Sequence, residues 1–465
     1  MIRTIFAAAA LLVAAVPVAA QSQQEALDAR QDRALAAGYK ALMLCGAIAN
    51  AEANGATRTP GSVAHWELNG IQSPLDKLVH DLGYSIQRSE QGGVESVTVA
   101  WADDMPPRTA AYTERKGCRL APIGTPSGHE GSPLANPDPA PRHLNTVLPL
   151  ETQSEASVSL KATALGAFEG RYGADARTTA VHIASPGGVF EQYHADFADN
   201  VPQRTWSVAK SIAATLIGAA VQRGEADVSA SAGLGLSADD PRRAITIDHL
   251  LRMASGRYSD TPGNRTDPLY WGGATVEEVA LDWPLVAAPG STYRYANNDT
   301  LAAVAAIRPT FAAHPPAELF ARLGMKHTIA ETDWQGRYIL SSQVWTTARD
   351  LARFGQLYLN DGKLPDGTHI LPEGWVKYVS TPSGPQPVGT FGYGAGFWLL
   401  NSSEGVPPDT FAAIGNRGQY VVIVPSRQVV IVRRGEDPAG SGFDIAAFTR
   451  DVLAALPRKQ DRGTR

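Results

Sequence analysis

The chain has 465 residues and a formal net charge of -5, with 19% charged and 44% hydrophobic residues, which is ordinary for a soluble globular protein. This balance excludes proteins that bind nucleic acid through a basic face, so we expect no nucleic-acid partner. The length favours two or three domains, and the basic tail at 458–465 is expected to be a solvated end.

Residues 1–20 have the three parts of a secretory signal peptide. Arg3 precedes an apolar run over 5–16, and small residues lead to a cleavage position after Ala20. The run is shorter than the roughly 20 residues that span a bilayer, although an uncleaved anchor is the alternative. We therefore expect a secreted protein, in the periplasm, with no stable membrane span after cleavage.

The next segment, 21–120, is predicted to be a separate N-terminal part. Apolar residues at helical spacing predict a helix over 24–49, and alternation over 94–101 predicts a strand. Cys45 and Cys118 are the only cysteines, which favours a disulfide bond in an exported protein and is too few for a structural zinc site. The Pro-rich stretch that follows predicts a linker or arm over 121–174.

Strand patterns lie at both ends of the remaining chain, and helical patterns lie between them. Strands are predicted over 179–184, 189–194, 419–424 and 428–432, and helices over 208–222, 348–359 and 446–456. We therefore expect an α/β protein of the α+β kind, in which an antiparallel sheet is flanked by helices and interrupted by a mostly helical insertion at about 207–345. This domain is expected to span 175–457.

The tetrad Ser207-Val-Ala-Lys210 is the main candidate for chemistry. Three residues make nearly one helical turn, which places the Lys210 amine beside the Ser207 hydroxyl. A serine hydroxyl needs a base to become nucleophilic, and a buried lysine can lose its proton near neutral pH. The alternative is that Ser207 only caps the buried helix that follows it.

A second candidate is Tyr295-Ala-Asn297, in which the phenol can carry protons and the carboxamide can orient the lysine and the substrate. The same spacing occurs at Tyr358 and Asn360, where an amphipathic helix explains the tyrosine as a core residue. Tyr295 follows the Pro-Gly-Ser turn at 289–291, where a packed tyrosine is less expected.

Together these motifs resemble the class C β-lactamase-related serine hydrolases of the penicillin-recognising fold. The resemblance is carried over about 175–455 by five stretches in the family's order: 206–211, 245–256, 289–297, 323–325 and 346–355. That family includes esterases, amidases such as the 6-aminohexanoate-dimer hydrolases, DD-peptidases and β-lactamases. The resemblance implies acyl transfer through an acyl-Ser207, with Lys210 and Tyr295 moving protons and no cofactor or metal.

The family's third motif corresponds here to Gly415-Asn-Arg-Gly-Gln419. By position, the resemblance places Asn416, Gly418 and Gln419 at the substrate, with the amides of Ser207 and Gln419 as the oxyanion hole. Neutral Asn416 replaces the usual cation, and Arg417 is expected to point to the other face of the strand. Because a carboxylate-bearing substrate needs a fixed cation, this departure favours an uncharged small-molecule ester or amide over a β-lactam or cell-wall peptide.

Two other readings remain open: a β-lactamase or DD-peptidase, and a non-catalytic binding protein that keeps the pocket. Tyr258, Tyr270 and Trp271 are predicted to shape the acyl pocket, whereas Asp248 and His249 are predicted to pack or cap a helix. The sequence does not predict the natural substrate or the oligomeric state, nor which of Lys210 and Tyr295 is the base in acylation.

Overall fold

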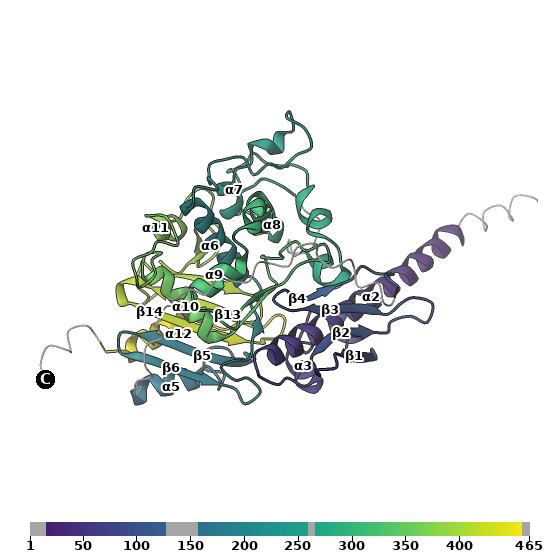
Figure 1. The fold of residues 1–465 in the computed structure, drawn as a ribbon, viewed down its shortest axis with the longest axis horizontal. Coiled ribbons are helices and arrows are strands. Elements are labelled where there is room, and N and C mark those ends of the chain that lie inside the picture. Colours follow the sequence, from purple (N-terminus) through teal and green to yellow (C-terminus); the bar gives the residue numbers. More distant parts are fainter. Residues whose placement is uncertain (1–14, 127–156, 259–265, 458–465) are drawn as a thin grey trace, which may run out of the picture.

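A computed structural model describes residues 15–126, 157–258 and 266–457, with side chains from residue 22 onward. Most of the predicted signal peptide, most of the predicted linker and the basic tail lie outside these residues. Two sheets carry the fold, one in an N-terminal module that we define as residues 22–126, and one in the larger part that follows (Figure 1).

The larger part is organised on a seven-stranded antiparallel sheet with strand order β10-β11-β12-β13-β14-β5-β6. Its strands are β5 (Thr178–Ser185), β6 (Gly188–Tyr193), β10 (Gly392–Tyr393), β11 (Trp398–Leu399), β12 (Phe411–Gly415), β13 (Gln419–Val424) and β14 (Val429–Gly435). The first hairpin and the C-terminal pair of strands therefore meet in the middle of one sheet, because β14 pairs with β5.

Helices cover both faces of this sheet, which explains why β13 and β14 are buried at nearly every position. On β14, Val430 and Val432 face a core that includes α6 (Val208–Gln222) and α10 (Ala348–Leu359). Val429 and Ile431 face α5 (Val158–Gly166) and α12 (Ile445–Ala455) on the other side. In Figure 1, α5 and α12 lie beside β5 and β6, whereas α6 lies above the sheet among the inserted helices.

The insertion between the two halves of the sheet holds short helices and a small second sheet. The helices are η1 (Pro241–Ala244), α7 (Ile247–Leu251), η3 (Pro268–Gly272), η4 (Glu277–Leu281), α8 (Asn297–Ala306), η5 (Arg308–Ala312) and α9 (Pro316–Arg322). Strands β7 (Gln203–Arg204), β9 (Val344–Thr346) and β8 (Ile329–Ala330) form the small sheet in that order. Beyond it, α11 (Trp375–Ser380) and η6 (Pro425–Arg427) complete the described elements of this part.

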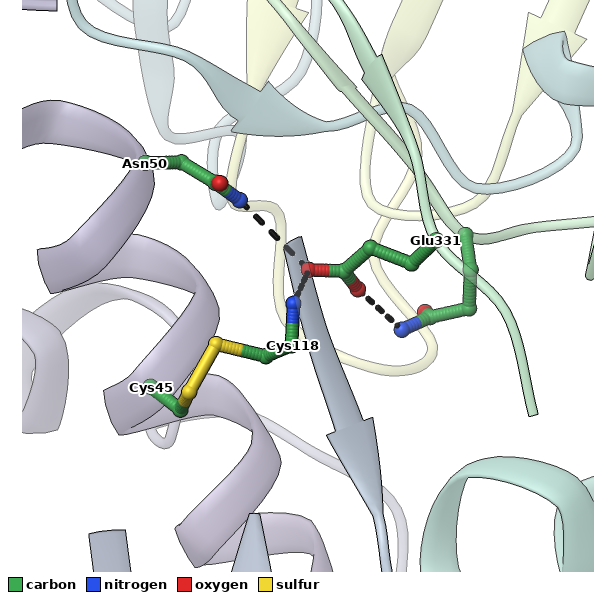
Figure 2. The surroundings of a disulfide bond; sticks show 5 residues. Cys45, Asn50, Cys118 and Glu331 are labelled. Atoms are coloured by element: carbon green, nitrogen blue, oxygen red, sulfur yellow. Dashed lines mark hydrogen bonds between the residues drawn. A yellow bond between two sulfur atoms is a disulfide. The ribbon is translucent and has the colours of Figure 1, made fainter. Parts of the chain in front are cut away.

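The N-terminal module packs a long helix on a four-stranded antiparallel sheet (Figure 1). Its elements are α2 (Ala15–Ala53), α3 (Pro60–Trp66), α4 (Leu75–Leu78), β1 (Tyr84–Arg88), β2 (Val94–Val99), β3 (Arg108–Thr113) and β4 (Gly117–Leu120). The Cys45–Cys118 disulfide ties α2 to β4, as the sequence predicted (Figure 2).

The core of this module continues into the larger part. Trp206, Trp271 and Trp345 belong to the same buried cluster as the apolar residues of α2. Among the described residues one helical stretch, Ser22–Ala53, is long and apolar enough to cross a membrane, but 94% of its apolar window is buried inside the protein. The apolar character of α2 is therefore explained by packing between β2, β3, β4 and η3.

Most of the predicted elements are confirmed, and three differences concern their limits. The helix predicted over 24–49 extends over Ala15–Ala53 as α2. Helix α5 lies inside the stretch assigned to the linker and packs against α12, so the layer that covers the sheet begins before residue 175. The third difference is that β1, β3 and β4 accompany the one N-terminal strand that the sequence predicted.

Candidate active site

Ser207 lies at the start of α6, directly after the edge strand β7. The chain turns sharply there, because Trp206 has a positive φ of 50°, which is unfavourable for a bulky residue. The Arg204 guanidinium lies 3.6 Å from the centroid of the Trp206 ring and holds this ring in place. Ser207 occupies the N-cap position, but its side chain makes no capping hydrogen bond, so the simple capping alternative does not hold.

Lys210, one turn later, donates a 2.9 Å hydrogen bond from Nζ to the Ser207 hydroxyl. The same amine contacts Asn297 Oδ1 and the Ser341 carbonyl, the latter at 3.1 Å. All three acceptors are neutral. Asn297 begins α8, so helices α6 and α8 meet at this amine, and the structure brings together the predicted residues Ser207, Lys210 and Asn297.

The Lys210 amine is only 2% exposed, and burial is the cause that shifts its ionisation. Burial disfavours the ammonium form and lowers the pKa of Lys210 from 10.5 to about 7. A substantial fraction of this side chain is therefore neutral near pH 7, and the neutral amine can accept the proton of the Ser207 hydroxyl.

Tyr295 lies close to both Ser207 and Lys210. Its hydroxyl forms hydrogen bonds with the side chains of Ser207 and Trp398, and Lys210 Nζ lies 5.0 Å from the centroid of its ring. Burial raises the pKa of Tyr295 to about 12, while those two hydrogen bonds favour the phenolate. The phenol therefore keeps its proton at neutral pH and can donate a hydrogen bond or relay a proton.

The loop that carries Tyr295 is anchored by a buried ion pair. Arg257 donates to Asp299 Oδ1 at 3.0 Å, and Ser255 Oγ donates to the same oxygen at 2.7 Å. Gly256 has φ of 73°, and a Cβ there would lie 2.1 Å from the Ala287 carbonyl. The Ser255-Gly256 pair is thus required for the close contact that fixes the loop before Tyr295.

The end of β12 approaches the nucleophile most closely at Gly415. A Cβ on this residue would lie 2.4 Å from the Thr205 carbonyl and 3.0 Å from the Ser207 amide nitrogen. Asn416 follows directly and uses its side-chain oxygen to accept a hydrogen bond from the Arg417 amide at 2.9 Å. The backbone at Gly415 and Asn416 therefore borders the Ser207 amide.

Gly418 and Gln419 are placed differently from their predicted roles. The close contact at Gly418 is with Arg433 and Asp437, not with the nucleophile. The Gln419 side chain is fully buried and binds Arg434 and the Gly435 carbonyl. Gln419 lies opposite Gly415 in the β12–β13 ladder, so its backbone belongs to the sheet.

The three aromatic residues predicted to shape the acyl pocket lie in two different surroundings. Tyr270 and Trp271 are buried in the core shared with α2, and Tyr258 lies exposed beside Trp283. The aromatic groups next to the nucleophile are Tyr295, Tyr393 and Trp398, whose ring centroids lie 5.1–6.0 Å apart.

Two histidines have structural contacts, and that of His249 is the one the sequence predicted. His249 forms a capping box with Thr246 at the start of α7. His182 lies 3.2 Å from Glu191 on the neighbouring strand, well within the sheet.

Comparisons with known proteins agree with this geometry. The family model described as Beta-lactamase matches residues 170–454. A solved Bacillus anthracis structure, provisionally assigned as a 6-aminohexanoate-dimer hydrolase, is 23% identical with a TM-score of 0.51, over 61% of this chain and 81% of that one. A provisionally assigned β-lactamase from Bacteroides dorei is 19% identical with a TM-score of 0.51, over 64% and 98%. No curated protein matches the sequence significantly. At these identities the solved structures show a shared fold.

Proposed function

The chain belongs to the β-lactamase family, whose members are serine hydrolases, and we propose that it is an exported hydrolase that cleaves an ester or amide through an acyl-Ser207 intermediate. One observation carries this proposal. The Ser207 hydroxyl lies 2.9 Å from a buried lysine amine whose pKa is lowered to about 7, and it also hydrogen-bonds Tyr295. A nucleophile between a neutral base and a proton donor is the arrangement that acyl transfer needs.

In the proposed first step, neutral Lys210 accepts the Ser207 proton while Oγ attacks the substrate carbonyl. The C–O bond to Ser207 forms, and the carbonyl oxygen becomes an oxyanion. Tyr295 then donates its proton to the departing alkoxide or amine and is reprotonated by the Lys210 ammonium. This division follows from the two pKa values, about 7 and about 12, because at neutral pH the lysine is the better acceptor and the phenol remains protonated.

For the oxyanion we propose the amides of Ser207 and Asn416. Gly415 brings the backbone of β12 against the Ser207 amide, and Asn416 supplies the next amide along the chain. The Gln419 amide is less suitable because Gln419 pairs with Gly415 across the ladder. In deacylation the oxygen of a water bonds to the acyl carbon, the bond from this carbon to Ser207 Oγ breaks, and the acid product leaves, while the proton of the water returns through Lys210 and Tyr295 to Oγ.

A neutral substrate fits the surroundings of this site. Asn416 is uncharged where a carboxylate-binding cation is expected, and the guanidinium of the adjacent Arg417 is 2.8 Å from Glu436 and buried. Trp398, which is partly exposed, packs beside Tyr295, and this aromatic surface favours an apolar acyl or leaving group. For location we propose the periplasm, on the basis of the N-terminal signal pattern and the Cys45–Cys118 disulfide.

Intact-protein mass spectrometry tests this function. The mature protein is incubated with a fluorophosphonate and, separately, with a penicillin, beside a Ser207→Ala control. Fluorophosphonate labelling that requires Ser207, without a penicillin adduct, supports the esterase or amidase. A stable or turning-over penicillin adduct at Ser207 replaces it with a β-lactamase or DD-peptidase. If neither adduct forms, the proposal that the protein is an enzyme is contradicted, and a non-catalytic binding protein remains.

A further inference from the structure

Arg417 is the residue at the tip of the turn that joins β12 to β13, and it is almost completely buried, with 6% exposure. Its backbone has φ of 55°, in the left-handed region that an arginine rarely adopts. The tertiary structure therefore has to hold this turn in place, since the local sequence does not favour the conformation.

The N-terminal module supplies that support. Arg417 Nη2 donates to the Trp66 carbonyl at 2.7 Å and to the Asn69 carbonyl at 2.8 Å. Trp66 is the last residue of α3 and Asn69 lies in the loop that follows, 351 and 348 residues away in the sequence. A guanidinium presents its donors in a rigid planar fork, whereas a lysine amine is a single point on a flexible stem, so Arg417→Lys is not expected to reproduce the same set of contacts.

Charged groups around the guanidinium complete the anchor. Arg417 Nε lies 2.8 Å from Glu436 Oε2, and the ion pair of Arg58 and Glu67 lies close by in the N-terminal module, with 2.8 Å between its charged atoms. Each part of the chain thus contributes one cation and one carboxylate to a buried network. Removing Arg417 would leave Glu436 as a buried carboxylate without its partner, which is costly.

The backbone of the turn is fixed by the same contacts. The Arg417 carbonyl accepts a hydrogen bond from the Asp437 amide at 3.2 Å, and the Gly70 carbonyl accepts one from the Ala439 amide at 2.7 Å. Gly70 has φ of 68°, and a Cβ on it would lie 2.9 Å from Pro438. The 66–70 loop, the 437–439 segment and the 416–418 turn are therefore locked together.

We propose that Arg417 is a positioning residue for the oxyanion-binding turn, and that the N-terminal module takes part in catalysis by holding it through the Trp66 and Asn69 carbonyls. This inference rests on the proposed function, because it gives the Asn416 amide its place beside the Ser207 amide. The support comes from outside the 170–454 region that matches the family model.

The test compares Arg417→Ala, Arg417→Lys and Gly70→Ala with the wild-type protein in the hydrolysis of p-nitrophenyl acetate. Removing one oxyanion donor costs about 10²–10³-fold in kcat, so a displaced donor is expected to cost about 10–100-fold. KM should change by less than about twofold, because the turn acts mainly on the transition state. Affinity for phenylboronic acid, which forms a tetrahedral adduct with the serine, should fall in parallel with kcat/KM.

Glu331→Gln is the matched control. Glu331 is a buried carboxyl group at the same junction, where it accepts hydrogen bonds from Cys118, Asn50 and Gln343, but it is not part of the Arg417 network (Figure 2). Its kcat should equal that of the wild-type protein. All rates are measured well below the melting temperature of each variant, on protein whose fold is verified by circular dichroism.

The outcomes separate this inference from the proposed function. If the wild-type protein neither hydrolyses the ester nor reacts with a fluorophosphonate, the proposed function fails. If the wild-type protein is active and every variant that folds keeps its kcat, the role of Arg417 is wrong. The role is equally wrong if Glu331→Gln loses as much kcat as the others. If Arg417→Ala does not fold, Gly70→Ala still tests the inference. This substitution displaces the loop that binds Arg417 without leaving a buried charge unpaired.

Discussion

The two sides of the Ser207 hydroxyl are supported by different parts of the chain. On one side, Lys210, Asn297 and Tyr295 are held by α6, α8 and the preceding loop, all within the region that matches the family model. On the other side, the turn after β12 is held by carbonyls of the N-terminal module. The group of Lys210, Asn297 and Tyr295 is therefore built within the hydrolase fold alone, whereas the turn after β12 depends on contacts between the N-terminal module and the larger part.

Each side contains one of two buried basic side chains, Lys210 and Arg417, and their surroundings differ in charge. Among the described residues, the hydrogen-bond acceptors of Lys210 are neutral, and burial lowers the pKa of Lys210 to about 7, which suits the proposed role as a base. Arg417 is paired with Glu436 and stays a fixed charge. A buried cation without a carboxylate partner can release its proton, whereas a cation in an ion pair keeps its position. The comparison therefore assigns proton transfer to Lys210 and positioning to Arg417.

The largest effect is expected at the proton-transfer side. Replacement of Lys210 by alanine should lower kcat for p-nitrophenyl acetate by about 10³–10⁴-fold, because Ser207 loses its base. Lys210→Arg should be similarly inactive, since a guanidinium does not give up its proton near neutral pH. Steady-state kinetics provide the measurement. An active Lys210→Arg enzyme would show that the lysine contributes only its charge.

Removal of the Cys45–Cys118 disulfide, which lies in the N-terminal module, is expected to lower the free energy of unfolding rather than kcat. Cys45→Ala with Cys118→Ala opens a loop with a sequence separation of 73 residues. The chain-entropy relation gives a loss of about 4 kcal/mol in the free energy of unfolding. Urea unfolding measures this, with the wild-type protein as reference. An unchanged midpoint would mean that the module is held by its core alone.

Tyr295→Phe tests the second proton carrier while keeping the ring contacts with Trp398 and Tyr393. Loss of the hydroxyl should lower kcat by about 10²-fold, with little change in KM, because the leaving group no longer receives a proton from the phenol. Esters with good leaving groups need this proton less. A series of phenyl esters should therefore show a smaller defect as the leaving group becomes more acidic; a uniform defect would contradict the relay.

The smallest change to the protein itself is a change of pH, which titrates Lys210 without any substitution. Because burial lowers the Lys210 pKa to about 7, the neutral base predominates above this pH and the ammonium below it. The rate should therefore rise about tenfold per pH unit up to about pH 7 and then level off. Arg417→Lys should lower the plateau without moving this inflection, because it lies outside the Lys210 contacts. A pH profile flat from 5 to 8 would contradict Lys210 as the base.

The sequence alone predicted those helices and strands whose apolar residues follow a regular local spacing. Helices α6 and α10 begin and end where helical spacing of apolar residues predicted, and the strands of the β5–β6 hairpin were placed to within two residues. The contact of Ser207 with Lys210 also followed, because one helical turn fixes it whatever the rest of the fold does.

Tertiary structure decided the features that depend on contacts between distant segments. The side chain of Arg417 reaches Trp66 across 351 residues, and no local pattern encodes such a contact. Sequence order assigned the close approach to Gly418, whereas the folded β12–β13 ladder gives it to Gly415. Likewise, the sequence predicted that Tyr270 and Trp271 shape a pocket, but in the folded protein they pack in the core that includes α2. The sequence thus determined most of the elements and the contact between Ser207 and Lys210, the proposed nucleophile and base, whereas the backbone that faces them was decided by which distant segments pack together.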